Sequence, residues 1–152
     1  MAEPLWRRVL FPRRRGAALG GPRVLALTSS ATDQAFYRSL KARGQWDMEI
    51  TQSVPEALRM LSAGSFSIVV FDREFPGWDW RDLLVRIVER SPRSCCLLAS
   101  RVSDEYLWRE VVARGGYDVV TKPLADPAVS LTLQRAWYYW KTESPPMVNP
   151  SA

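Results

Sequence analysis

The chain has 152 residues, an apolar content of 47%, a charged content of 24% and a formal net charge of +5. A chain of this size can bury the core of one globular domain without disulfides or metal. It contains no histidine, which excludes a Ser-His-Asp triad, an HExxH zinc site and a phosphohistidine relay within the molecule. No apolar stretch approaches the roughly 20 residues that a membrane span needs.

The excess positive charge is concentrated at the N-terminus. Residues 1–23 carry six arginines and one glutamate, and the remainder of the chain is neutral. Residues 1–22 are therefore predicted to form a disordered, solvated basic arm. Clustered arginines also bind phosphates, so contact with nucleic acid or an acidic partner stays open. An export signal also stays open, although Gly20-Gly21-Pro22 breaks its short apolar stretch.

Five short apolar runs predict five strands. In chain order they are RVLALT (23–28), WDMEIT (46–51), FSIVVFD (66–72), CCLLAS (95–100) and YDVVT (117–121). Four of them are nearly continuously apolar, as expected for parallel strands covered on both faces, whereas 46–51 alternates as an edge strand does. Adjacent Cys95 and Cys96 would point to opposite faces of their strand, so we expect free thiols in a reducing cytoplasm.

Helical patterns with capping residues fill the gaps between these runs. We expect helices after Ser29-Ser30, after Ser53, after Asp79, after Ser103 and from Pro127 to about Tyr139. The alternation of strands and helices predicts one α/β domain over 23–141. Its fold class is a doubly wound, five-stranded parallel sheet with helices on both faces. Residues 142–152 are predicted to be a disordered tail.

Polar side chains follow the strands at the edge where such sheets carry their functional crevice. They are Thr28-Ser29-Ser30, Asp72, Ser100 and Lys122. A carboxylate can attack a phosphoryl group, while an ammonium and a hydroxyl stabilise the phosphoryl oxygens. The strand ends therefore predict an anion site that contains Asp72.

With these landmarks, residues 23 to about 140 resemble the receiver domain of bacterial two-component response regulators, a flavodoxin-like (βα)5 fold. The resemblance is carried by FDREFPGWDW, by Ser100 and by Thr121-Lys122-Pro123, at separations of 28 and 22 residues. It implies that Asp72 is the phosphoacceptor, Ser100 the switch hydroxyl and Lys122 the phosphoryl-binding lysine, followed by a cis proline. A sensor histidine kinase or a phosphotransfer protein would be the phosphoryl donor.

Two features depart from the family's pattern. Ser29 and Ser30 occupy the positions of the acidic pair that holds Mg²⁺, which leaves Asp72, with Glu74 as the one candidate for a compensating carboxylate. We expect Mg²⁺ binding to be weak or absent and expect no other cofactor. Val119 stands where the family usually carries an aromatic that reports phosphorylation to the surface, and valine cannot swing in the same way.

Aromatic residues mark two further places. In the last helix, Trp137 and Tyr138 should lie partly outside the core stripe of Val129, Leu133, Ala136 and Trp140. The face formed by the helix after Ser103, the strand 117–121 and the last helix is thus expected to bind a protein or a second copy. Trp78 and Trp80 are expected to cap the pocket beside Asp72. Nucleic acid is not expected to bind at these two tryptophans, because no basic and aromatic alternation accompanies them.

Two functions stay open. The first is a single-domain response regulator in a phosphorelay, which acts by protein binding and has at most self-phosphorylation at Asp72 as activity. The second is a pseudo-receiver, a protein-binding adaptor that is not phosphorylated, which Ser29, Ser30 and Val119 favour. Both would act in the cytoplasm. An unrelated small enzyme on this fold is the third alternative, and the sequence lacks a glycine-rich phosphate loop for it.

Overall fold

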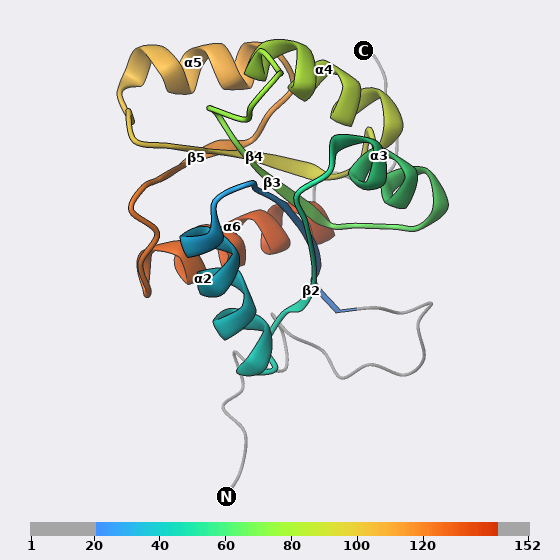
Figure 1. The fold of residues 1–152 in the computed structure, drawn as a ribbon, viewed down its shortest axis with the longest axis vertical. Helices are drawn as coiled ribbons and strands as arrows, with labels where there is room; N and C mark the ends of the chain where they lie inside the picture. Colours follow the sequence, from blue (N-terminus) through green and yellow to red (C-terminus); the bar gives the residue numbers. More distant parts are fainter. Residues whose placement is uncertain (1–20, 143–152) are drawn as a thin grey trace, which may run out of the picture.

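The computed structural model describes residues 21–142, so the predicted basic arm and the predicted tail lie outside the described residues except at 21, 22 and 142. This part of the chain forms ten elements (Figure 1), in the order β1 (Arg23–Leu27), α2 (Ala31–Ala42), β2 (Asp47–Thr51), α3 (Val54–Ala63), β3 (Ile68–Asp72), α4 (Trp80–Arg90), β4 (Cys95–Ser100), α5 (Glu105–Ala113), β5 (Asp118–Thr121) and α6 (Ala128–Thr142). Every predicted strand is present, with bounds that differ by at most two residues.

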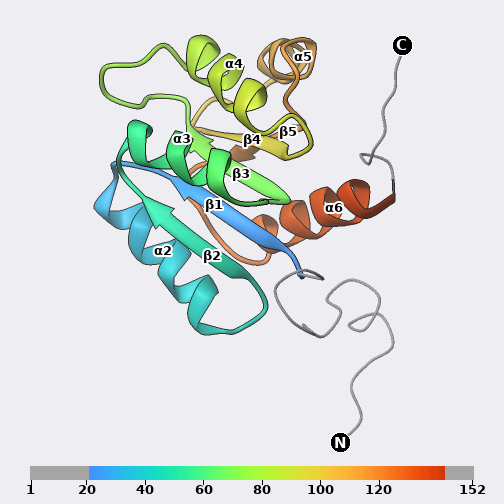
Figure 2. The ribbon, with the colours of Figure 1, turned by 90° about the vertical axis from the view of Figure 1, so that its right-hand side faces the viewer.

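The five strands form one parallel sheet in the order β2-β1-β3-β4-β5. This confirms the predicted fold class and places β2 at an edge, as its alternating pattern indicated. Helices α3, α4 and α5 cover one face of the sheet, and α2 and α6 cover the other (Figure 2). Within residues 21–142, none of the helices combines the length and the apolar character needed to cross a bilayer.

The core consists of two apolar layers, one on each face of the sheet. Successive strand residues alternate between them, so Leu25 and Val69 face α3, α4 and α5, whereas Val24 and Ile68 face α2 and α6. Cys95 and Cys96 likewise lie in opposite layers, and both are buried free thiols. Each buried aliphatic side chain contributes about 1.5–3 kcal/mol relative to an exposed one. A shift of one residue along a strand would move its side chains to the opposite faces, so this burial fixes the strand register.

The helix starts are capped largely as the sequence predicts. Ser30, Ser53 and Asp79 each accept a hydrogen bond from a backbone N–H in the first turn of α2, α3 and α4. The predicted cap at Ser103 is wrong. Helix α5 begins at Glu105, so the capping position falls on Asp104, whose Oδ1 accepts from the Leu107 N–H at 2.8 Å. Aspartate is as good a cap as serine, so helix register decides between these neighbours.

The predicted exposure of Trp137 is also wrong. The buried face of α6 is wider than one row of residues and includes Val129, Leu133, Ala136 and Trp137. Trp137 is only 2% exposed and stacks on half-buried Trp140, with ring centroids 5.3 Å apart. A globular helix commonly buries a stripe broader than 100°. Tyr138 lies on the other side of the helix and is exposed, as predicted.

Candidate functional site

The strand order brings the predicted site residues to neighbouring strand ends. Asp72 is the last residue of β3 and Ser100 the last of β4, and Lys122 directly follows β5. The Asp72 Oδ1 atom lies 3.1 Å from the Lys122 Nζ atom as an ion pair. The peptide bond between Lys122 and Pro123 is cis. The structure therefore brings together the carboxylate and the ammonium that the sequence places fifty residues apart.

Thr28 completes the surroundings of the Asp72 carboxylate. This residue directly follows β1 and is fully buried, and its hydroxyl donates a hydrogen bond of 2.5 Å to Asp72 Oδ2. The same hydroxyl oxygen accepts from the Ser30 N–H at 3.1 Å, which fixes its orientation. Asp72 Oδ2 therefore accepts a hydrogen bond, whereas buried Oδ1 has only the ion pair with Lys122, and the residue is only 3% exposed.

Asp33 is a member of the site that the sequence analysis missed. It lies in the first turn of α2, where the Ser30 cap fixes the turn, and its Oδ2 atom is 2.7 Å from Lys122 Nζ. A signal was present, because Asp33, Tyr37 and Leu40 share one helical stripe and all three are buried. A carboxylate on the inward stripe of the helix after β1 indicates a partner inside the crevice.

We call these four residues, Thr28, Asp33, Asp72 and Lys122, the Asp72 site. It holds two carboxylates and one ammonium, so its formal charge is −1. Burial alone would lower the pKa of Lys122, but the hydrogen bond to Asp33 and the charge of Asp72 raise it above its ordinary value. Lys122 is thus held as a cation between two acids. Burial, together with these acids, also keeps the pKa of Tyr37 well above its usual range.

The other predicted residues are not among the four that form the Asp72 site. The Ser100 hydroxyl is buried and accepts from the Val102 N–H at 3.0 Å, which ties down the loop after β4. Ser29 is exposed, and Ser30 is engaged in capping α2. The Glu74 carboxylate is 73% exposed and has Arg73 as an ion-pair partner at 3.9 Å. This exposure and pairing do not favour a role for Glu74 as a metal ligand beside Asp72.

The donor set of the Asp72 site does not fit a magnesium ion. Mg²⁺ prefers carboxylates and waters in near-octahedral geometry. Among residues 21–142 no group of three or more acidic, histidine or cysteine side chains is arranged to hold a metal. The two carboxylates that do converge share the ammonium of Lys122. Thr28, whose side chain lies beside Asp72, offers a neutral hydroxyl in place of an acid.

Of the two tryptophans after Asp72, Trp80 does not cap the site. Trp80 is the first residue of α4 and is 4% exposed, so it belongs to the apolar layer under α3, α4 and α5. The prediction that it lies in the loop and covers the pocket is wrong. Helix α4 begins directly after Asp79, and this turns the Trp80 side chain inward. Trp78 remains in the loop, half-buried against the same layer, with the Arg86 guanidinium 5.3 Å from its ring centroid.

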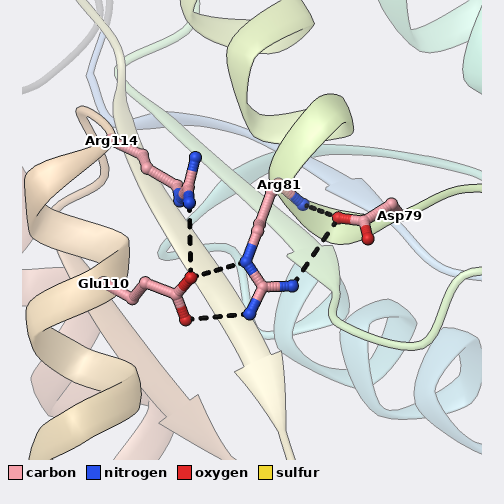
Figure 3. A network of polar contacts seen from close by, with 4 residues as sticks. All are labelled: Asp79, Arg81, Glu110 and Arg114. Atoms are coloured by element: carbon pink, nitrogen blue, oxygen red, sulfur yellow. Dashed lines mark hydrogen bonds and ion pairs between the residues drawn. The ribbon is translucent and has the colours of Figure 1, made fainter.

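Helix α5 is tied to α4 by a network of charged side chains (Figure 3). Arg81 donates two hydrogen bonds to Glu110, at 2.5 Å and 3.0 Å, and Arg114 approaches the same carboxylate at 3.4 Å. The hydrogen bond from Arg81 holds the pKa of Glu110 below its ordinary value. Bidentate pairs of this kind fix geometry as well as charge. Val119 is half-buried and packs into the apolar layer under α3, α4 and α5.

We compared the chain with known proteins and solved structures. No protein-family model matches the sequence, and no curated protein matches it. Solved structures do match, among them a CheY-like response regulator receiver domain protein from Methanospirillum hungatei JF-1, with 16% identity, a TM-score of 0.70 and coverage of 80% of this chain and 98% of that one. The chain has the receiver fold.

Two further receiver structures support this assignment of the fold. The signal receiver domain of an HD domain-containing protein from Pseudomonas fluorescens Pf-5 has 22% identity and a TM-score of 0.71, over 80% of this chain and 98% of that one. A response regulator from Burkholderia pseudomallei, solved with a phosphorylated aspartic acid and a calcium ion, has 17% identity and a TM-score of 0.65, over 80% and 72% of the two chains. The receiver fold therefore extends over the described residues.

Proposed function

We propose that this protein is a pseudo-receiver, a protein-binding signalling module in which the Asp72 site is not phosphorylated efficiently. The observation that supports this most strongly is the position of Lys122, whose ammonium contacts both Asp33 and Asp72. The ammonium thus pairs with both acids that a divalent ion would otherwise engage, and the site keeps a formal charge of −1. The Thr28 hydroxyl satisfies the remaining oxygen of Asp72.

The electrostatics of phosphoryl transfer support the same reading. When a carboxylate attacks a dianionic phosphoryl group, cations must neutralise charge in the transition state, and a metal ion contributes several kcal/mol there. In the Asp72 site the only cation among the described residues is Lys122, and it is shared with Asp33. We therefore expect the rate of phosphorylation at Asp72 to be very low.

A specific observation favours a second candidate, a phosphorylated receiver. Asp72, Ser100 and Lys122 lie at three adjacent strand ends, the arrangement that the family resemblance implies for a phosphoacceptor. In that case an Asp72 oxygen would displace the imidazole of a phosphohistidine on a kinase or phosphotransfer protein, forming an O–P bond as the N–P bond breaks. No other enzymatic activity is proposed for either candidate.

The experiment that separates the two candidates is direct phosphorylation. The protein is incubated with acetyl phosphate and MgCl₂, and its intact mass is measured, with Asp72→Ala as the control. We expect no mass increase in the wild-type protein. A gain of one phosphoryl group that disappears in Asp72→Ala would refute the pseudo-receiver and establish the second candidate.

The surface that we propose for protein binding is the face formed by α5, β5 and α6. Its two helices carry large apolar side chains that are exposed to solvent, namely Trp108 and Val112 on α5 and Leu131, Tyr138 and Tyr139 on α6. A hollow of about 460 Å³ on this face is lined by Tyr117, Leu131, Tyr138 and Tyr139. Exposed aromatic clusters of this kind mark protein contacts. The buried free thiols favour the cytoplasm as the compartment.

A further inference from the structure

A second hollow lies on another face of the molecule, between α3 and α4. These helices pack against each other on one face of the sheet (Figure 1, Figure 2). The groove between their outer sides has a volume of about 460 Å³, within the range of ligand-binding clefts. It begins at Trp78, six residues after Asp72 in the chain, and continues along both helices to Arg90.

The groove has a basic rim. Arg59 lines it from α3, and Arg86 and Arg90 line it from α4. None of the described residues that line the groove carries a carboxylate. We call this groove, with its three arginines and its apolar floor, the arginine groove.

The guanidinium groups of the rim have mainly neutral partners. Arg86 lies over the Trp78 ring, and Arg90 donates to the Leu58 carbonyl at 3.4 Å and to the Ser62 hydroxyl at 3.2 Å. Arg59 pairs with Glu56, but both side chains are largely exposed, and such surface pairs contribute little. Arg86 and Arg90 stand one turn apart on the same helix face, where like charges repel. The rim therefore favours an anionic ligand.

The floor of the arginine groove is apolar. The apolar residues that line it are Val54, Pro55, Leu58 and Trp78. Leu58 and Val54 belong to the buried layer beneath, and Trp78 packs against that layer, so the floor is rigid. A free inorganic anion has no apolar surface to bury on this floor, whereas an amphipathic ligand would bury its apolar groups there.

We propose that the arginine groove binds an acidic, amphipathic peptide segment of a partner protein, with its carboxylates on the arginines and its apolar side chains on Trp78 and Leu58. Tryptophan and arginine are the residues most enriched at the centres of protein interfaces. Guanidinium groups pair with carboxylates in a bidentate manner. The proposal rests on the function as a protein-binding module and adds a second binding face with a partner of defined chemistry.

The test uses a fluorescein-labelled synthetic peptide with leucine and phenylalanine at helical spacing and glutamate at its other positions. Fluorescence anisotropy measures its binding to the full chain. We expect saturable binding that weakens as salt increases. The double variant Arg86→Glu and Arg90→Glu should weaken binding by at least about tenfold, because close interfacial charge pairs contribute 1.4 kcal/mol or more. A peptide with lysine in place of glutamate should not bind.

A matched control carries the same change in charge elsewhere. Arg101 and Arg109 are exposed and lie outside the groove, so Arg101→Glu with Arg109→Glu should bind the peptide as the wild type does. Circular dichroism and thermal unfolding verify that each variant is folded. Should the Arg86 and Arg90 double variant unfold, Arg86→Gln with Arg90→Gln replaces it and should also weaken binding.

Three results would overturn the proposal. The first is absence of saturable binding, and the second is equal binding by the groove variant and its control. The third is displacement of the peptide by ATP or inorganic phosphate at equal concentration, because the groove would then be a site for small anions. The assay contains no phosphoryl donor. Its failure therefore leaves the outcome of the acetyl phosphate experiment at Asp72 unaffected, and the two proposals fail separately.

Discussion

Lys122 makes two ion pairs, and its position determines the chemistry of the Asp72 site. Its Nζ atom lies 2.7 Å from Asp33 and 3.1 Å from Asp72, in a region where all three side chains are largely buried. Removal of either partner from a buried pair leaves an uncompensated charge, which is costly. Each of these three charged side chains therefore has a partner of opposite charge without a metal ion.

The hydroxyl of Thr28 is predicted to stabilise the fold through its hydrogen bond to Asp72. In Thr28→Val the shape is kept, but a buried carboxylate oxygen loses its donor and the Ser30 N–H loses its acceptor. We expect the free energy of unfolding, measured by urea denaturation, to fall by about 1–3 kcal/mol. Ser29→Ala is the control, because Ser29 is exposed, and should change it by less than about 0.5 kcal/mol. Equal stability of wild type and Thr28→Val would contradict the role given to this bond.

At the residue scale, the sequence predicts strand-end residues well and loop contacts poorly. Asp72 and Lys122 meet because strand order alone carries them to the same edge. Thr28 and Asp33 were not identified as contacts, because the direction of their side chains depends on how the Ser30 cap turns the chain into α2. That geometry follows from a few local hydrogen bonds that hydrophobic periodicity does not reveal.

At the scale of elements, the cap of α5 distinguishes the structure from the sequence prediction. Asp104, not Ser103, accepts the hydrogen bond from the Leu107 N–H. We therefore expect Asp104→Ala to lower the thermal stability by an amount equivalent to about 1 kcal/mol, whereas Ser103→Ala should have little effect. If Ser103→Ala proves to be the more damaging substitution, α5 begins one residue earlier than the structure shows.

The two cysteines of β4 make the stability of the folded state depend on pH in a predictable direction. Burial raises the pKa of Cys95 and of Cys96 to about 12, well above the value of about 8.5 of an unfolded thiol. The folded state therefore keeps protons that the unfolded state releases. The resulting stabilisation is fully present below about pH 8.5 and is lost as the pH rises toward 12.

The corresponding measurement is thiol labelling with a disulfide reagent at pH 8. We expect neither cysteine to react in the folded protein and both to react after denaturation with urea, because the thiolate is the nucleophile. Rapid labelling of the folded protein would show that β4 is open to solvent and would contradict the burial of both side chains. Unfolding curves recorded at pH 7 and pH 10 should show lower stability at the higher value.

Aromatic residues near helix ends were the hardest elements to place from the sequence. Trp80 was predicted to cover the pocket from a loop and Trp137 to lie partly outside the core, and both are buried. Each lies at the margin of an apolar stripe, where a rotation of about 100° per residue separates the core from solvent. Packing against neighbouring helices decides such positions, and this information is not local in sequence.

At the scale of the whole molecule, the fold was predictable because its strands carry consistent signals. Nearly continuous apolar runs indicated a parallel sheet buried on both faces, and the alternating run 46–51 indicated the edge strand β2. The surfaces were less predictable. The arginine groove arises because α3 and α4 lie side by side, which neither helix sequence shows alone.

We expect the ammonium of Lys122, together with the hydroxyl of Thr28, to exclude a divalent cation from the Asp72 carboxylate. The most direct test is a Mg²⁺ titration by isothermal calorimetry of the wild type and of the variant Thr28→Asp. The variant replaces the hydroxyl beside Asp72 with a carboxylate, which favours a hard cation. We predict no saturable binding to the wild type at millimolar Mg²⁺ and saturable binding to the variant. Binding of Mg²⁺ by the wild type that is lost in Asp72→Ala would contradict the account.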